Sequence, residues 1–142
     1  EETQTAGIVP VPGAPSVVSA AQSGAWAVVT SAPRRLAEIR IAAAGLPLPG
    51  LLVPVDEIQR GKPDPEGYLR AARHFGVEAH ECLVFEDTGP GIEAGLRAGM
   101  QVVGLLTTVP REQLPCEYVV RDFRDVKVTP NERGFHVAIH SV

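Results

Sequence analysis

Hydrophobic and polar positions alternate between two kinds of pattern along this chain. Short, nearly continuous apolar runs are typical of strands buried on both faces, and they occur at 26–30, 51–55, 82–86, 101–106 and 118–120. Between them, apolar residues recur every three or four positions, which predicts helices at 12–22, 33–44, 63–75 and 90–99. Because the two patterns alternate, the sequence predicts an α/β fold in which helices cover both faces of a parallel sheet.

The carboxyl-terminal segment has a different pattern. In "VKVTPNERGFHVAIH" (126–140), Phe135, Val137 and Ile139 alternate with His136 and other residues, which predicts a β-hairpin. A length of 142 residues suits one domain. We therefore expect a single unit with a linker at 1–11, a core at 12–122 and a terminal hairpin at 123–142.

Composition narrows the function classes. The net charge of −4 gives no sign of nucleic-acid or membrane binding. No apolar stretch is long enough to cross a bilayer, and residues 1–20 lack the pattern of a signal peptide. Cys82 and Cys116 fit buried thiols in a reducing compartment better than a disulfide framework, and they are too few for a cysteine zinc site. The expectation is a cytoplasmic protein with neither nucleic acid nor membrane as a partner.

Polar residues follow two of the predicted strands at the point where each strand ends. The first strand ends at Thr30 and is followed by Ser31, and the third ends at Glu86 and is followed by Asp87. Ligands of parallel sheets bind beyond the carboxyl ends of strands, so both pairs should lie at one edge. Hydroxyls at a helix start suit phosphate, and adjacent carboxylates suit Mg²⁺. Lys62, just before a predicted helix, could neutralise phosphate charge at the same edge.

Each of these residues also has a purely structural interpretation. Ser31 could cap the helix predicted at 33–44, and Asp87 could cap the helix predicted at 90–99. Lys62 could be an ordinary surface lysine. Tyr68 is expected to pack in the core or near the surface. The residue types alone leave these alternatives open.

Three segments, in their order, resemble a known family. "AVVTSAPRRL", "QRGKPDPEGYL" and "LVFEDTGPGIEAGLRAGM" resemble the second, third and fourth motifs of the haloacid dehalogenase-like superfamily of Mg²⁺-dependent phosphotransferases. The resemblance extends from about residue 9 to residue 122. Two of the segments look most like glycerol-3-phosphatases and 2-deoxyglucose-6-phosphatases, with β-phosphoglucomutase a close relative. The resemblance implies a three-layer Rossmann-like fold and Mg²⁺-dependent hydrolysis of small phosphorylated sugars or polyols through an aspartyl-phosphate intermediate.

The resemblance also implies a role for each candidate residue. The substrate phosphate would be bound by Thr30, Ser31, the Ala32 backbone N–H and Lys62, of which Ser31 and Lys62 would be catalytic. Asp87 would ligate Mg²⁺, and Glu86 would hold a metal-bound water or the lysine.

The sequence departs from the family at its first motif. Asp-x-Asp-Gly-[Thr/Val] supplies the attacking and the acid/base aspartates in the family, upstream of the serine motif, but the first aspartate here is Asp56. We therefore expect the carboxyl-terminal half of a phosphatase, without the usual first, central strand and without the cap domain, and residues 1–11 resemble the exit from a cap. Such a chain is expected to be inactive alone and to self-associate through the gap in its sheet. The alternatives are a non-catalytic binding or regulatory module, and a sugar phosphomutase.

Overall fold

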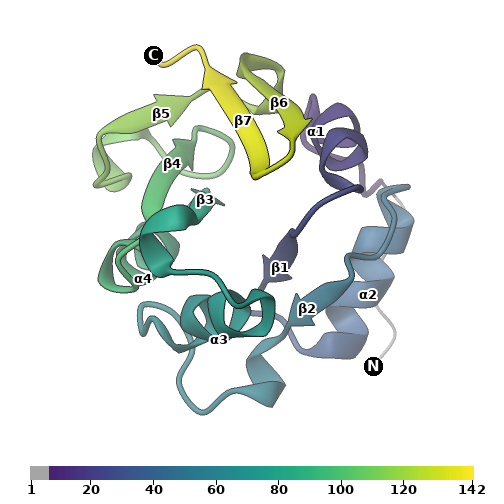
Figure 1. The fold of residues 1–142 in the computed structure, drawn as a ribbon, viewed down its shortest axis with the longest axis vertical. Coiled ribbons are helices and arrows are strands. Elements are labelled where there is room, and N and C mark those ends of the chain that lie inside the picture. The colour runs from purple at the N-terminus through teal and green to yellow at the C-terminus, as the bar shows by residue number, and fades with distance from the viewer. Residues whose placement is uncertain (1–6) are drawn as a thin grey trace.

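Strands and helices alternate along most of the chain in the computed structural model, which describes residues 7–142 (Figure 1). The expected linker at 1–11 therefore lies partly outside the described residues. The helices are α1 (Ala14–Ala21), α2 (Arg34–Ala43), α3 (Glu66–Phe75) and α4 (Gly89–Arg97). The strands are β1 (Ala27–Val29), β2 (Leu51–Val53), β3 (Leu83–Glu86), β4 (Gln101–Leu105), β5 (Tyr118–Val120), β6 (Val126–Asn131) and β7 (Gly134–Ile139).

The predicted elements are present, most of them with bounds that differ by one to three residues, and two of these differences have a local cause. β2 ends at Val53 and not at residue 55, because Pro54 has no N–H to donate to a neighbouring strand. α3 begins at Glu66 and not at residue 63. Before it, Asp64 Oδ1 accepts a hydrogen bond of 2.9 Å from the Glu66 N–H, a local turn that competes with helix.

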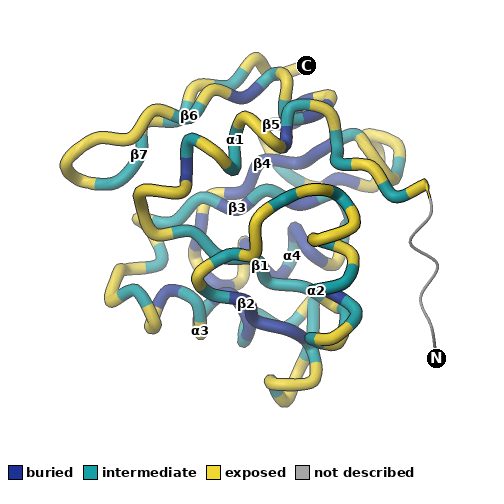
Figure 2. Tube along the Cα trace, turned by 90° about the vertical axis from the view of Figure 1, so that its right-hand side faces the viewer, coloured by how far each residue is buried: buried dark blue, intermediate teal, exposed yellow. Residues whose placement is uncertain are grey.

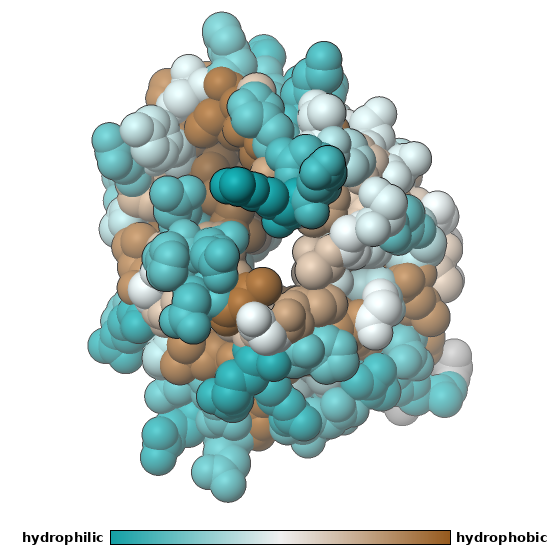
Figure 3. All heavy atoms as spheres, viewed as in Figure 1, coloured by the Kyte–Doolittle hydropathy of each residue, from teal (hydrophilic) through white to brown (hydrophobic). Residues whose placement is uncertain are grey.

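The strands form separate sheets. β1 pairs in parallel with β2, so that Ala27 lies opposite Leu51. β3, β4 and β5 form a second parallel sheet. Among residues 7–142, no pairing joins β1 to β3, and Figure 3 shows an opening through the molecule with hydrophobic residues on part of its rim. This arrangement agrees with the expectation that a central strand is lacking.

Helices pack closely on each half of the divided sheet. α3 lies on β1 and β2, and a Cβ added to Gly67 would stand 2.7 Å from Val29 Cγ1. α4 lies on β3 and β4, where a Cβ on Gly95 would stand 2.7 Å from Val102 Cγ2. The core is concentrated in the second half, around residues such as the fully buried Ile92, and Figure 2 shows buried segments along β3 and β4.

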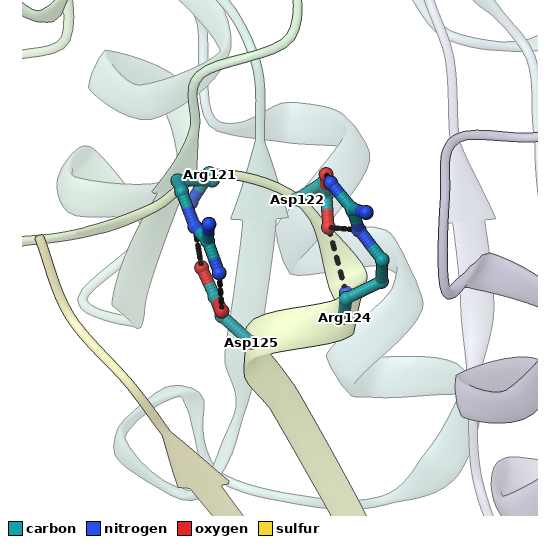
Figure 4. Close-up of polar contacts among 4 residues, drawn as sticks. All are labelled: Arg121, Asp122, Arg124 and Asp125. Carbon is teal, nitrogen blue, oxygen red and sulfur yellow. Dashed lines mark hydrogen bonds and ion pairs between the residues drawn. The ribbon is translucent and has the colours of Figure 1, made fainter.

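β6 and β7 form the predicted hairpin, with antiparallel pairing that places Val126 opposite Ile139. Two ion pairs stabilise the turn before it: Arg121 with Asp125, and Arg124 with Asp122, both at 2.8 Å (Figure 4). The end of the hairpin is linked back to this turn and to β5 by two backbone hydrogen bonds of 2.8 Å, from the His140 N–H to the Asp125 carbonyl and from the Val142 N–H to the Val119 carbonyl. None of the helices in the described part of the chain has the length and apolar character needed to cross a membrane.

Candidate functional site

Lys62 links the two halves of the divided sheet. Its Nζ donates a hydrogen bond of 2.9 Å to the Val29 carbonyl at the end of β1, and it forms an ion pair with Glu86 at the end of β3. The Lys62 and Glu86 side chains are 15 % and 6 % exposed. The carboxyl ends of β1 and β3 therefore meet at one edge, although the two strands are not paired. Thr30 and Asp87 follow these ends directly in sequence, and Ser31 comes immediately after Thr30.

Glu86 is buried, and its carboxylate has a second hydrogen-bond partner besides Lys62. The Tyr68 hydroxyl also donates to its Oε2 atom, and the Lys62 ammonium lies 5.4 Å from the centre of the Tyr68 ring. Burial raises the pKa of the Tyr68 phenol far above its ordinary value, and the neighbouring Glu86 carboxylate raises it further. On the other side, a Cβ at Gly91 would lie 2.0 Å from Glu86 Oε1. A buried carboxylate needs such partners, since an unpaired charge in the interior is strongly destabilising.

Asp87, the next residue, is half-buried and contacts a different loop. Its Oδ2 atom accepts a hydrogen bond of 2.6 Å from Thr108 Oγ1, in the loop after β4. The alternative that Asp87 caps α4 is wrong: Thr88 is the N-cap, and its hydroxyl accepts from the Gly91 N–H at 3.4 Å. Asp87 therefore stands just before the positive end of α4, where a carboxylate is favoured.

The loop after β1 contains an internal hydrogen bond between its backbone and a side chain. The Ala32 N–H, expected to contact phosphate, donates to Thr30 Oγ1 at 3.0 Å, and Ser31 is exposed. The alternative that Ser31 caps α2 is wrong, because Pro33 is the N-cap and no side chain there accepts a capping hydrogen bond. Thr30 and Ser31 thus follow the strand end that Lys62 contacts.

The described residues could provide one carboxylate ligand for a magnesium ion. Among residues 7–142, no group of three or more histidine, cysteine, aspartate or glutamate side chains is placed to hold a metal ion. The Glu86 charge is already paired with Lys62, which leaves Asp87. Since Mg²⁺ commonly binds through one or two carboxylates together with phosphate and water, Asp87 fits it as a partial site.

Two residues of this site were not identified from the sequence. Tyr68 was expected to pack in the core or near the surface; it is buried in the core, and its hydroxyl contacts Glu86. Thr108 went unnoticed, although "TT" at 107–108 follows close after β4 and the same rule about strand ends applies to it. The signal for Thr108 was therefore available, whereas the Tyr68 contact depends on how α3 packs.

Comparison with known proteins identifies the family. Residues 2–99 match the haloacid dehalogenase-like hydrolases, which is well over half of the chain. The chain belongs to this family. The resemblance seen in its three sequence motifs is confirmed.

The relatives and solved structures that it matches are longer than this chain. It is 34 % identical over 137 residues to hexitol phosphatase A of Escherichia coli, covering 94 % of this chain and 63 % of the relative. It is 30 % identical over 133 residues to glycerol-1-phosphate phosphohydrolase 2 of Saccharomyces cerevisiae, covering 84 % and 53 %. The structure of a putative β-phosphoglucomutase from Thermotoga maritima superposes with a TM-score of 0.67 at 28 % identity, covering 77 % and 54 %. The chain thus spans a little over half the length of these proteins.

Proposed function

We propose that this chain supplies the phosphate-binding side, and one metal ligand, of a Mg²⁺-dependent phosphatase of small phosphorylated sugars or polyols. The observation that carries the proposal is the Lys62 ammonium, held by Glu86 at the edge where Ser31 and Asp87 follow their strands. Two relatives named for hexitol and for glycerol 1-phosphate favour a polyol or sugar phosphate as the substrate.

Lys62 is suited to stabilise a transferring phosphoryl group. An ammonium has three N–H donors; here one is directed at the Val29 carbonyl and one at Glu86, so a third is left for a phosphoryl oxygen. Because the position is largely shielded from water, its charge acts more strongly there than it would in solution. Glu86 keeps the ammonium in place and compensates its charge.

The other residues divide between phosphate and metal. The Thr30 and Ser31 hydroxyls donate to the phosphoryl oxygens, and the Ala32 N–H assists once it is released from Thr30. Asp87, oriented by Thr108, provides a carboxylate oxygen for Mg²⁺. When bound, Mg²⁺ would offset negative charge on the phosphoryl group.

The attacking carboxylate comes from outside residues 7–142 in this proposal. Glu86 is engaged with Lys62 and Tyr68, and Asp64 accepts the Glu66 N–H, so neither suits the role. Residues 1–6 contain no aspartate. In the described part of the chain, β1 pairs with β2 alone and β3 with β4 alone, so one extended segment carrying the attacking and acid/base aspartates at its end would add between them. Residues 12–122 would then form a partial core and 123–142 an appended hairpin.

The proposed roles are tested by phosphate release from the completed protein, in which residues 1–142 are joined to a segment with the Asp-x-Asp motif. Asp87→Asn is expected to raise the Mg²⁺ concentration needed for turnover. Lys62→Ala is expected to lower kcat by ~10²–10³ even at saturating Mg²⁺, as is typical when one charge-stabilising donor is lost. The matched control is Lys127→Ala, which removes the only other lysine, an exposed one, and should leave kcat unchanged. Full kcat in Lys62→Ala would contradict the assigned role.

A sugar phosphomutase is the second candidate, because the chain resembles the structure of a putative β-phosphoglucomutase. A mutase returns the phosphoryl group to the sugar, so an isomeric sugar phosphate accumulates without inorganic phosphate. Chromatography of the sugar phosphates in the same reaction distinguishes the two. Accumulation of inorganic phosphate supports the phosphatase, and accumulation of the isomer alone supports the mutase.

A further inference from the structure

Tyr68 makes a polar contact that core packing alone does not require. It lies in the first turn of α3, is 8 % exposed, and its hydroxyl donates to Glu86 Oε2. Its raised pKa means that the hydroxyl keeps its proton, and remains a donor, throughout the physiological pH range.

Glu86 Oε2 also accepts a hydrogen bond from Lys62, so the Tyr68 hydroxyl and the Lys62 ammonium share one carboxylate oxygen. Lys62 also lies near the Tyr68 ring, at 5.4 Å from its centre, within the range of a cation–π contact. With the tyrosine hydroxyl present, Glu86 has a donor from α3 in addition to the lysine. Without it, Glu86 would retain only Lys62 and could rotate with the flexible lysine side chain.

We propose that Tyr68 is a positioning residue, which fixes the Glu86 carboxylate and through it the Lys62 ammonium at the carboxyl ends of β1 and β3. The hydroxyl acts on the geometry of Lys62 and does not touch the substrate. Its effect on turnover rests on the proposed phosphatase function, whereas its effect on Lys62 does not.

The first test uses residues 1–142 alone and requires no activity. The chain has two lysines, Lys62 and the exposed Lys127, and two tyrosines, Tyr68 and the exposed Tyr118. Proton exchange of each lysine ammonium is measured by ¹⁵N NMR in the wild type, Tyr68→Phe and Tyr118→Phe. Tyr68→Phe should speed exchange at Lys62 about tenfold, the factor expected when a hydrogen bond to a charged group is lost. Lys127 should not change in either variant, and Lys62 should not change in Tyr118→Phe.

An unchanged Lys62 exchange rate in a folded Tyr68→Phe chain overturns the proposal. The contact can also be tested without altering Tyr68. The wild-type spectrum should contain a slowly exchanging Tyr68 hydroxyl proton, which Glu86→Gln shifts or broadens. The absence of that proton overturns the proposal even if Tyr68→Phe does not fold.

The second test measures turnover in the completed protein. Tyr68→Phe should lower kcat about tenfold with little change in KM, because the misplaced ammonium is needed most in the transition state. Combined with Glu86→Gln, it should cause no additional loss, because the tyrosine acts through Glu86. If the two substitutions instead lower kcat independently, so that their factors multiply in the double variant, Tyr68 does not act through Glu86. If the completed protein releases no phosphate, the proposed function fails, while the exchange measurement still decides the role of Tyr68.

Discussion

At the scale of single residues, Gly91 sets how closely α4 can approach Glu86. A methyl group at position 91 would lie 2.0 Å from Glu86 Oε1, far inside van der Waals contact. Gly91→Ala should therefore displace the carboxylate from Lys62 and Tyr68. The expected cost is roughly 1–3 kcal/mol in the free energy of unfolding, typical of overpacking in an interior.

Chemical denaturation of Gly91→Ala measures this cost, and Gly50→Ala is the matched control. Nothing lies within 4 Å of a Cβ at Gly50, and its backbone angles do not strain an alanine. The control should unfold like the wild type. Equal stability of Gly91→Ala and Gly50→Ala would show that Glu86 is not confined as described.

At the scale of elements, the turn that joins β5 to the β6–β7 hairpin depends on two aspartates. The Arg121 guanidinium lowers the pKa of Asp125 from its ordinary 3.8 to about 2, and the Arg124 guanidinium lowers that of Asp122 (Figure 4). A lowered pKa in the folded state stabilises the fold above the unfolded-state value, and this stabilisation is lost as pH falls through the folded-state value. The hairpin should therefore loosen between about pH 4 and about pH 2.

Amide NMR across β6 and β7 during an acid titration follows this loosening. Asp125→Asn cannot carry the charge, so in that variant the change between about pH 4 and about pH 2 should be smaller. An identical titration of wild type and variant would contradict the role of the Arg121–Asp125 pair.

Elements formed by local sequence patterns could be predicted from the sequence, whereas contacts formed by tertiary packing could not. β1 and β3 were located because strands covered on both faces are continuous apolar runs. Lys62, Ser31 and Asp87 were located by their motifs and their places at element ends. The Tyr68–Glu86 and Thr108–Asp87 contacts join residues 18 and 21 positions apart, and they depend on the packing of α3 and on the path of a loop. The rule about strand ends can point to Thr108 as a candidate, but no local pattern encodes the two contacts themselves.

At the scale of the whole molecule, the dominant feature is the gap between two half-sheets. β1 with β2 and β3 with β4 and β5 are parallel and well packed by their helices, yet within residues 7–142 no strand lies between β1 and β3. The single lysine that joins their ends is also the residue that the proposed chemistry requires. In the proposed account, one added strand would therefore both join the two half-sheets and supply the attacking aspartate.

The most direct test of the account compares inorganic phosphate release by residues 1–142 alone with release by the completed protein, on the same small sugar and polyol phosphates with Mg²⁺. The account predicts no turnover by the chain alone, because residues 1–142 contain no Asp-x-Asp motif. It predicts Mg²⁺-dependent turnover once the Asp-x-Asp segment is supplied. Robust turnover by the chain alone, abolished by Asp87→Asn, would contradict the account, and so would an inactive completed protein that is folded.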